Sequence, residues 1–162
     1  EYVRRALDRL VALPVVEHAA AAVGAPFGNT YAIPLRVPGR DTLPRLTGGM
    51  QTPDVSAVTP DYFRTVGTRL VRGRLFEPSD RPDGAPVAVV SATMARVIWP
   101  GMDALGQCLM VGSSTACTRV VGVVEDARRA SLREEPIMRY YLLLGQEAML
   151  SNPDLLVRTR GK

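Results

Sequence analysis

This sequence of 162 residues has almost no lysine or histidine: Lys162 is its last residue and His18 its only histidine. A P-loop holds phosphate with a lysine inside a G-x-x-x-x-G-K-[ST] turn, and an H-E-x-x-H zinc site needs two histidines. Neither can form here. The G-x-G-x-x-G turn of dinucleotide-binding proteins and the G-x-S-x-G elbow of serine hydrolases are also missing. We therefore expect no catalytic residue, no metal and no cofactor, and interpret His18 as structural.

Long apolar runs are absent as well. A membrane-spanning helix takes about 20 apolar residues, and the longest run here, 19–27, is far shorter and contains Gly24 and Pro26. The first residues, Glu-Tyr-Val-Arg-Arg, are not followed by the apolar region of a signal peptide. Because the sequence also begins without methionine, we expect it to be a piece of a longer protein.

Positive charge is not gathered in one place. The net charge is +4, and arginines occur along the whole chain. A nucleic-acid interface needs basic residues clustered on one face. The two denser arginine groups, in 69–74 and 128–133, are short, and two glutamates follow the second. We therefore expect no nucleic-acid partner.

Short apolar segments separated by turn residues make up most of the chain. Alternating or β-branched apolar residues indicate strands, and apolar spacings of three and four indicate helices. Because the two do not alternate regularly, the pattern predicts an α+β protein with mixed strand pairing. The expected helices span 2–13, 60–66 and 92–98. The expected strands span 15–23, 31–37, 51–58, 69–76, 87–90, 105–111, 116–124, 139–144 and 155–159.

Helix-capping residues support two of these helices. Thr59 is a good N-cap, Pro60 fits the first helical position, and Gly67 favours the left-handed stop. Ser91 is the expected N-cap of the third helix. The helix starts are therefore predicted at Thr59 and Ser91.

The two cysteines, Cys108 and Cys117, lie on either side of a Gly-Ser-Ser-Thr turn. Their spacing is wrong for a C-x-x-C redox pair, and two cysteines with one histidine are too few for a zinc site. If the hairpin loop is 111–114, Cys108 faces Cys117 at a Cα distance of about 4.5 Å, which allows a disulfide. Two free buried thiols are the alternative. A disulfide would place the chain in an oxidising compartment.

Two other function classes are open at this point. A hydrolase could use a carboxylate pair from Asp80, Asp83, Glu125 or Asp126, although each has a simpler role as a cap, a turn former or a solvated charge. A secreted ligand-binding module would require a well-formed apolar pocket. Arg72 and Arg74 lie on one face of an extended segment and could bind an anion, but a solvated face is the simpler interpretation.

Three long blocks carry a family resemblance: "SAVTPDYFRTVGTRLVRGRLFEPSD", "PVAVVSATMARVIWPGMDALGQCLMVG" and "TRVVGVVEDARRASLREEPIMRYYLLL". Their order resembles the MacB-like periplasmic core domain of FtsX-type ABC-transporter permeases. The shared features are Ser/Thr-Pro-Asp-Tyr-Phe at a helix start, Arg-Gly-Arg-x-Phe, Val-Ala-Val-Val-Ser before a helix ending in Trp-Pro-Gly, and Val-Val-Gly-Val-Val-x-Asp. The resemblance covers 57–144 well and 1–56 more loosely.

The resemblance implies a fold with two lobes. A mixed α/β porter-like lobe would comprise 1–67 and 135–162, and a smaller, mainly β lobe, 68–134, would be inserted into it. Such domains usually return through a further helix and strand, so we expect either that these follow Lys162 in the longer protein or that this lobe is smaller. The helix over 2–13 would continue from a first membrane helix as a stalk.

The resemblance also implies a function without catalysis in this domain. The whole protein would be located in the bacterial cell membrane, and this domain would face the periplasm or the extracellular side. The domain would transmit conformational change from a cytoplasmic ATPase for efflux or export. Its partners would be a cytoplasmic ATP-binding subunit, reached through membrane segments, and also a second permease and a periplasmic protein. The loops 24–30 and 78–86 are candidates for partner contact, because recognition often uses loops.

Overall fold

The computed structural model describes residues 2–44, 52–127 and 137–161. An α+β fold with mixed pairing is confirmed: three helices and ten strands occur in these residues. The helices are α1 (Tyr2–Val11), α2 (Tyr62–Val66) and α3 (Ala92–Ile98). The strands are β1 (Val16–Val23), β2 (Tyr31–Ala32), β3 (Leu35–Arg36), β4 (Asp54–Val58), β5 (Leu70–Gly73), β6 (Val87–Ser91), β7 (Cys108–Val111), β8 (Thr118–Val124), β9 (Arg139–Leu143) and β10 (Asp154–Thr159).

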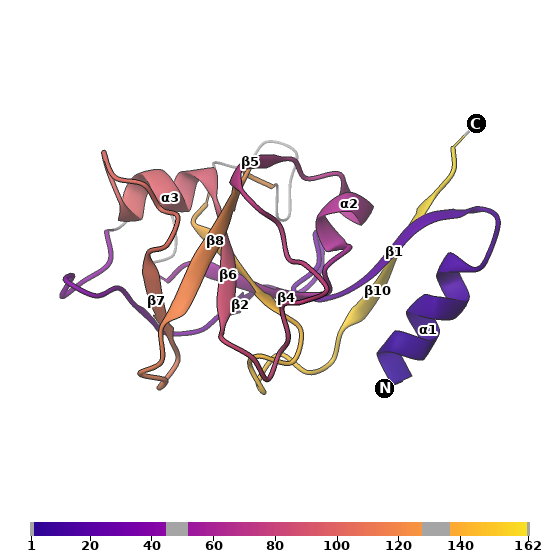
Figure 1. Ribbon diagram of the computed structural model, residues 1–162, viewed down its shortest axis with the longest axis horizontal. Coiled ribbons are helices and arrows are strands. Elements are labelled where there is room, and N and C mark those ends of the chain that lie inside the picture. The colour runs from indigo at the N-terminus through magenta and orange to yellow at the C-terminus, as the bar shows by residue number, and fades with distance from the viewer. Residues whose placement is uncertain (1, 45–51, 128–136, 162) are drawn as a thin grey trace.

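The strands form one continuous path in the order β10-β1-β4-β9-β6-β8-β7-β3, with β2 beside β4 and β5 beside β8 (Figure 1). The pairs β4–β9 and β6–β8 are parallel, and the others are antiparallel. The path passes directly from β9 to β6, so hydrogen-bonded strands join the segments 135–162 and 68–134. The division into two lobes stays a prediction, and its boundary at 134/135 lies outside the described residues.

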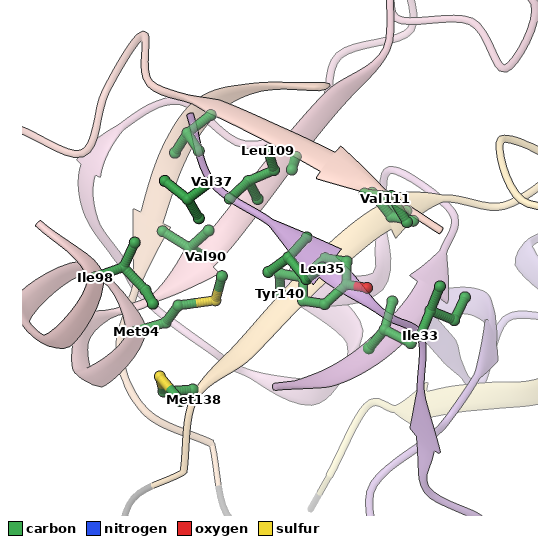
Figure 2. Packing of buried hydrophobic residues seen from close by; sticks show 14 of the residues in the cluster. Ile33, Leu35, Val37, Val90, Met94, Ile98, Leu109, Val111, Met138 and Tyr140 are labelled. Carbon is green, nitrogen blue, oxygen red and sulfur yellow. The ribbon is translucent and has the colours of Figure 1, made fainter. Parts of the chain in front are cut away.

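The core lies on both faces of the sheet, because neighbouring residues of each central strand point to opposite sides. Val90 and Tyr140 pack with Met94 and Ile98 of α3 on one face (Figure 2). Val89 packs with α2 on the other face, together with Ala20, Val58, Tyr62, Phe63 and Tyr141. Strands covered on both faces need apolar residues at every position, which explains the unbroken apolar run of β6.

Of the two predicted N-caps one is confirmed and one is wrong, and the predicted left-handed stop of α2 at Gly67 is confirmed with a φ of 80°. Ser91 caps α3 by accepting a hydrogen bond from the Met94 amide at 3.2 Å. Thr59 does not cap α2, which begins after Asp61. Its hydroxyl oxygen instead accepts a hydrogen bond from the Ala21 amide of β1 at 3.0 Å. Thr59 therefore joins the start of the α2 segment to the neighbouring strand rather than to its own helix.

The first helix, α1, lies against β1 at the end of the long axis where both chain termini are found (Figure 1). It ends at Val11, two residues earlier than the pattern predicts. Although its apolar residues form a stripe, none of its residues is buried. Within the described part of the chain, no helix combines the length and apolarity needed to cross a bilayer.

Candidate functional site

The disulfide hairpin is the first site that the sequence predicted. Cys108 of β7 and Cys117, just before β8, form a disulfide with their Cα atoms 5.2 Å apart. The predicted register is wrong, because Cys108 pairs with Arg119 and Leu109 with Thr118. This register places two buried residues, Leu109 and Thr118, opposite each other, whereas the predicted one would pair Leu109 with an exposed alanine. The loop is therefore longer than predicted, and Cys117 reaches Cys108 from outside the ladder.

Removing this disulfide should destabilise the fold measurably. Because the bond closes a ring of ten residues, the double variant C108A/C117A should lose about 2.7 kcal/mol of unfolding free energy by the chain-entropy relation. Urea unfolding followed by circular dichroism measures the loss. Dithiothreitol should destabilise the wild type by a similar amount and leave the variant unchanged. Equal stability of wild type and variant would contradict the prediction.

The four carboxylates considered for hydrolysis are held by different partners. Asp80 accepts two hydrogen bonds from Arg74, at 2.6 and 2.9 Å. Glu125 pairs with Arg69, which directly precedes β5, at 2.9 Å. Asp83 pairs with Arg81, two residues before it, at 3.6 Å. Asp126 accepts bonds from the backbone amide and hydroxyl of Thr93 at the start of α3. The carboxylates thus serve as ion-pair partners and as a helix cap.

These contacts set the protonation of two carboxyl groups. The hydrogen bonds from Arg74 lower the pKa of Asp80 below its ordinary value. The backbone and side-chain hydrogen bonds of Arg69 lower the pKa of Glu125 in the same way. A carboxyl with a lowered folded-state pKa stabilises the fold above its unfolded-state pKa, and this contribution is lost as the pH falls through the folded-state value. Both groups are therefore ionised in neutral solution.

The other predicted residues have ordinary structural roles. Arg72 pairs with Asp103 at 2.8 Å, so this arginine and Arg74 are both engaged by carboxylates rather than open to an anion. His18 is half-buried in β1, opposite Arg158 of β10. In the described residues, no three His, Cys, Asp or Glu side chains are placed to hold a metal ion.

A buried ion pair between Asp54 and Arg139 was missed. The two residues lie directly opposite each other on the parallel strands β4 and β9. Their side chains are 5% and 4% exposed, and Arg139 Nη2 lies 3.6 Å from Asp54 Oδ2. Asp54 and Arg139 are the first residues of two apolar strands. At such a position the sequence pattern does not show whether a charged side chain is exposed to solvent or buried in an ion pair.

A groove lies between α1 and the body of the domain. Its volume is about 760 Å³. One wall is the apolar stripe of α1, and the opposite wall comes from the loops after β4, β5 and β9. A second groove, of about 420 Å³, follows the other side of α1 to Leu155 of β10. The helix is thus attached to the body along a narrow line, mainly through β1.

The two predicted contact loops differ in their surroundings. Pro78 and Pro82, from the loop 78–86, line the groove beside α1. In the loop 24–30, Phe27 is 67% exposed and has a left-handed backbone with φ of 61°, which bulky residues rarely adopt. Contact of either loop with a partner stays a prediction.

A family model for the MacB-like periplasmic core domain matches residues 1–154. The chain belongs to this family. The MacB-like domain is 32% identical over 123 residues to the Macrolide export ATP-binding/permease protein MacB 2 of Aeromonas hydrophila. It is 35% identical over 107 residues to the Probable syringafactin export ATP-binding/permease protein SyfD of Pseudomonas syringae pv. syringae. These alignments cover 76% and 64% of this chain, but only 16% of each relative.

Solved structures support the same fold. The periplasmic region of MacB from Actinobacillus actinomycetemcomitans superposes with a TM-score of 0.67 at 17% identity, over 96% of this chain and 64% of that one. The extracellular domain of the transporter YknZ from Gram-positive bacteria gives 0.66 at 16% identity, over 98% and 73%. These structures thus share the fold of this MacB-like periplasmic core domain, and the expectation of a non-enzymatic component is confirmed by its family.

Proposed function

We propose that this domain is the extracytoplasmic part of an ABC-transporter permease that exports its cargo using ATP hydrolysis at the cytoplasmic side. The observation that carries the proposal is the family match over 1–154. The two relatives named above support it, since both names combine export with ATP-binding and permease functions. The disulfide agrees with an oxidising compartment. The proposed location is the bacterial cell membrane, with the domain on the periplasmic or extracellular side.

The attachment of α1 supports a role in transmitting motion. Since none of its residues is buried and its main contact is β1, α1 can shift against the domain without opening the core. The strand β1, second from the edge of the sheet, connects it directly with β4 and β10. In this proposal α1 passes movement from membrane segments to the sheet. In this proposal a second permease and a periplasmic protein also bind this domain.

A helix-breaking variant tests the transmission. Ala6→Pro in the full-length transporter should lower export of a macrolide, the cargo named for the relative MacB 2, by at least about tenfold, because proline breaks a helix interior at a cost of about 3 kcal/mol. ATP hydrolysis should continue. Ala6→Ser keeps the backbone N–H and is the matched control, with export close to the wild type. Unchanged export in Ala6→Pro would refute the proposed role of α1.

The proposed location is tested separately. Asn29 lies in the exposed loop 24–30, so an Asn29→Cys variant should react with a membrane-impermeant maleimide in cells whose outer barrier is opened but whose inner membrane is intact. The wild type is the control: both cysteines of this domain are in the disulfide, and its labelling gives the background from cysteines elsewhere in the longer protein. Labelling only after the inner membrane is broken would place the domain in the cytoplasm and overturn the proposed function.

A further inference from the structure

The face of the hairpin that carries the disulfide has a chemistry that the proposed transmission does not use. Cys108 and Arg119 lie directly opposite each other on β7 and β8. Residues paired in this way project from the same face of the sheet, with Cβ atoms about 4.5–5.5 Å apart. The next pair along, Leu109 and Thr118, is buried on the other face. The disulfide and the exposed side chain of Arg119 are therefore neighbours on the solvent side of the hairpin.

The two sulfur atoms of the disulfide differ in access. Cys117 is exposed and lines a hollow of about 520 Å³, whose walls also include Arg119 and much of the loop 78–86. Cys108 is half-buried within β7. A thiolate opens a disulfide by attacking the sulfur that it can reach, and the other sulfur leaves. A small thiol in the hollow therefore meets the sulfur of Cys117, and Cys108 is the leaving group.

Arg119 is the charge that the hairpin leaves uncompensated beside this leaving group. Of the other arginines that line the hollow, Arg74 is held by Asp80 at 2.6 Å and Arg81 pairs with Asp83 at 3.6 Å. Within the described residues, no carboxylate forms an ion pair with Arg119. A neighbouring positive charge lowers the pKa of a thiol, and a thiol of lower pKa leaves a disulfide faster.

Two other charged groups near the hairpin lie at its turn. Arg36 of β3 donates a hydrogen bond to the Ser114 carbonyl at 2.9 Å. The carboxylate of Glu147 lies close to Gly112. Both contacts are made to the turn between β7 and β8 and not to the paired residues of the ladder. Arg119 is therefore the charged residue that the ladder places beside the sulfur of Cys108.

We propose that Cys117 is a site of reversible S-thiolation by a low-molecular-weight thiol. The sulfur of the attacking thiolate forms a bond with Cys117 Sγ, the Cys108–Cys117 bond breaks, and its electron pair leaves on Cys108 Sγ beside Arg119. The attacking sulfur is oxidised to a mixed disulfide, the sulfur of Cys108 is reduced to a thiolate, and the proton of the attacking thiol goes to solvent. Attack of Cys108 on Cys117 Sγ reverses the step. This exchange goes beyond the proposed function, since it needs neither transport nor ATP.

The test uses 2-mercaptoethanol, which is uncharged, on the 162-residue chain, with acid quenching and peptide mass spectrometry. We expect the first mixed disulfide on Cys117 and a free thiol on Cys108. Arg119→Gln should lower the second-order rate constant at least about threefold, because the leaving thiol loses its neighbouring positive charge. Arg119→Lys keeps the charge and should retain most of the rate. Arg64→Gln, which removes the same charge from an exposed position of α2, is the matched control and should change the rate by less than about twofold.

The pKa of the leaving thiol distinguishes this role of Arg119 from a structural one. In the single-thiol variant Cys117→Ser, adding Arg119→Gln should raise the pKa of the Cys108 thiol by about one unit. Adding Arg64→Gln instead should leave that pKa unchanged. The pH dependence of alkylation by iodoacetamide measures it in each variant.

Four results would overturn the proposal. The first is a mixed disulfide that forms on Cys108 first, and the second is an equal rate in Arg119→Gln and Arg64→Gln. The third is a rate that rises with urea below the unfolding transition, because exchange would then occur through unfolding. The fourth is a disulfide that resists the thiol in the full-length transporter in nanodiscs, because another segment would then cover it. None of these results would alter the labelling of Asn29→Cys, which tests the proposed function independently.

Discussion

Asp54→Ala is expected to lower the free energy of unfolding by about 3–5 kcal/mol, the usual cost of breaking a buried ion pair. The variant leaves the Arg139 guanidinium, 4% exposed, without the carboxylate that faces it. Its Nε and Nη1 atoms already lack a hydrogen-bond acceptor in the part of the chain that the structure describes. Urea unfolding, followed by circular dichroism, measures the difference from the wild type.

The double variant Asp54→Leu/Arg139→Met separates the charge from the packing. It removes both charges and fills the space with apolar side chains, which in other proteins is often neutral or stabilising. We expect it to be clearly more stable than Asp54→Ala. If the double variant is as unstable as the single one, the cost comes from packing or from other contacts of Asp54, and the explanation by an unpaired charge is wrong.

Phe63→Ala should cost a similar amount, about 3–5 kcal/mol. Phe63 of α2 is fully buried and meets Tyr141 of β9 edge to face, with ring centroids 4.9 Å apart and an interplanar angle of 73°. Its ring also contacts Tyr62 and Phe76, at centroid distances of 5.4 and 6.0 Å. Removing the ring leaves a cavity at the centre of the cluster that joins α2 to the sheet. Thermal and urea unfolding measure the loss.

Phe27→Ala is the matched control, since it removes the same ring from an exposed position. Phe27 is 67% exposed, and alanine keeps the Cβ that makes its left-handed backbone unfavourable. The expected change in unfolding free energy is within about 0.5 kcal/mol. A loss in Phe27→Ala comparable to that in Phe63→Ala would mean that the ring at position 63 is not a specific support of the core.

The sequence predicted most elements because their signals are local. The residues 87–90 form an unbroken apolar run after a proline-rich turn, and this run becomes β6, which also includes Ser91. The residues 139–144 and 155–159 become β9 and β10 with ends shifted by one residue. The segment 31–37 was predicted as one strand, but it forms two short strands, since Pro34 interrupts pairing between them.

Capping signals succeeded only where no distant group competed. Ser91 has its partner, the Met94 amide, three residues away. The Thr59 hydroxyl could have used a nearby amide in the same way, yet it bonds to Ala21, which is 38 residues away in sequence. Such a bond exists only after β1 and β4 have come together, so no local pattern could indicate it.

The α1 groove and the Asp54–Arg139 pair were not predictable for the same reason. The α1 stripe was recognised, but a stripe does not tell how fully the fold covers it. The two charges lie 85 residues apart in sequence, and only the parallel pairing of β4 and β9 brings them face to face. The disulfide pairing, by contrast, was predicted from the count, the spacing and the hairpin register of the cysteines. The pairing is confirmed, although the register was wrong.

By itself, the sequence determined where helices and strands form, that its cysteines can join across a turn, and which family the ordered blocks resemble. These follow from backbone preferences, capping and turn chemistry, which act over a few residues. Only the tertiary structure decided the strand order, the hairpin register, the buried ion pair and the uncovered side of α1. Each of these depends on which distant surfaces exclude water together, and that choice is made by the packing of the whole chain.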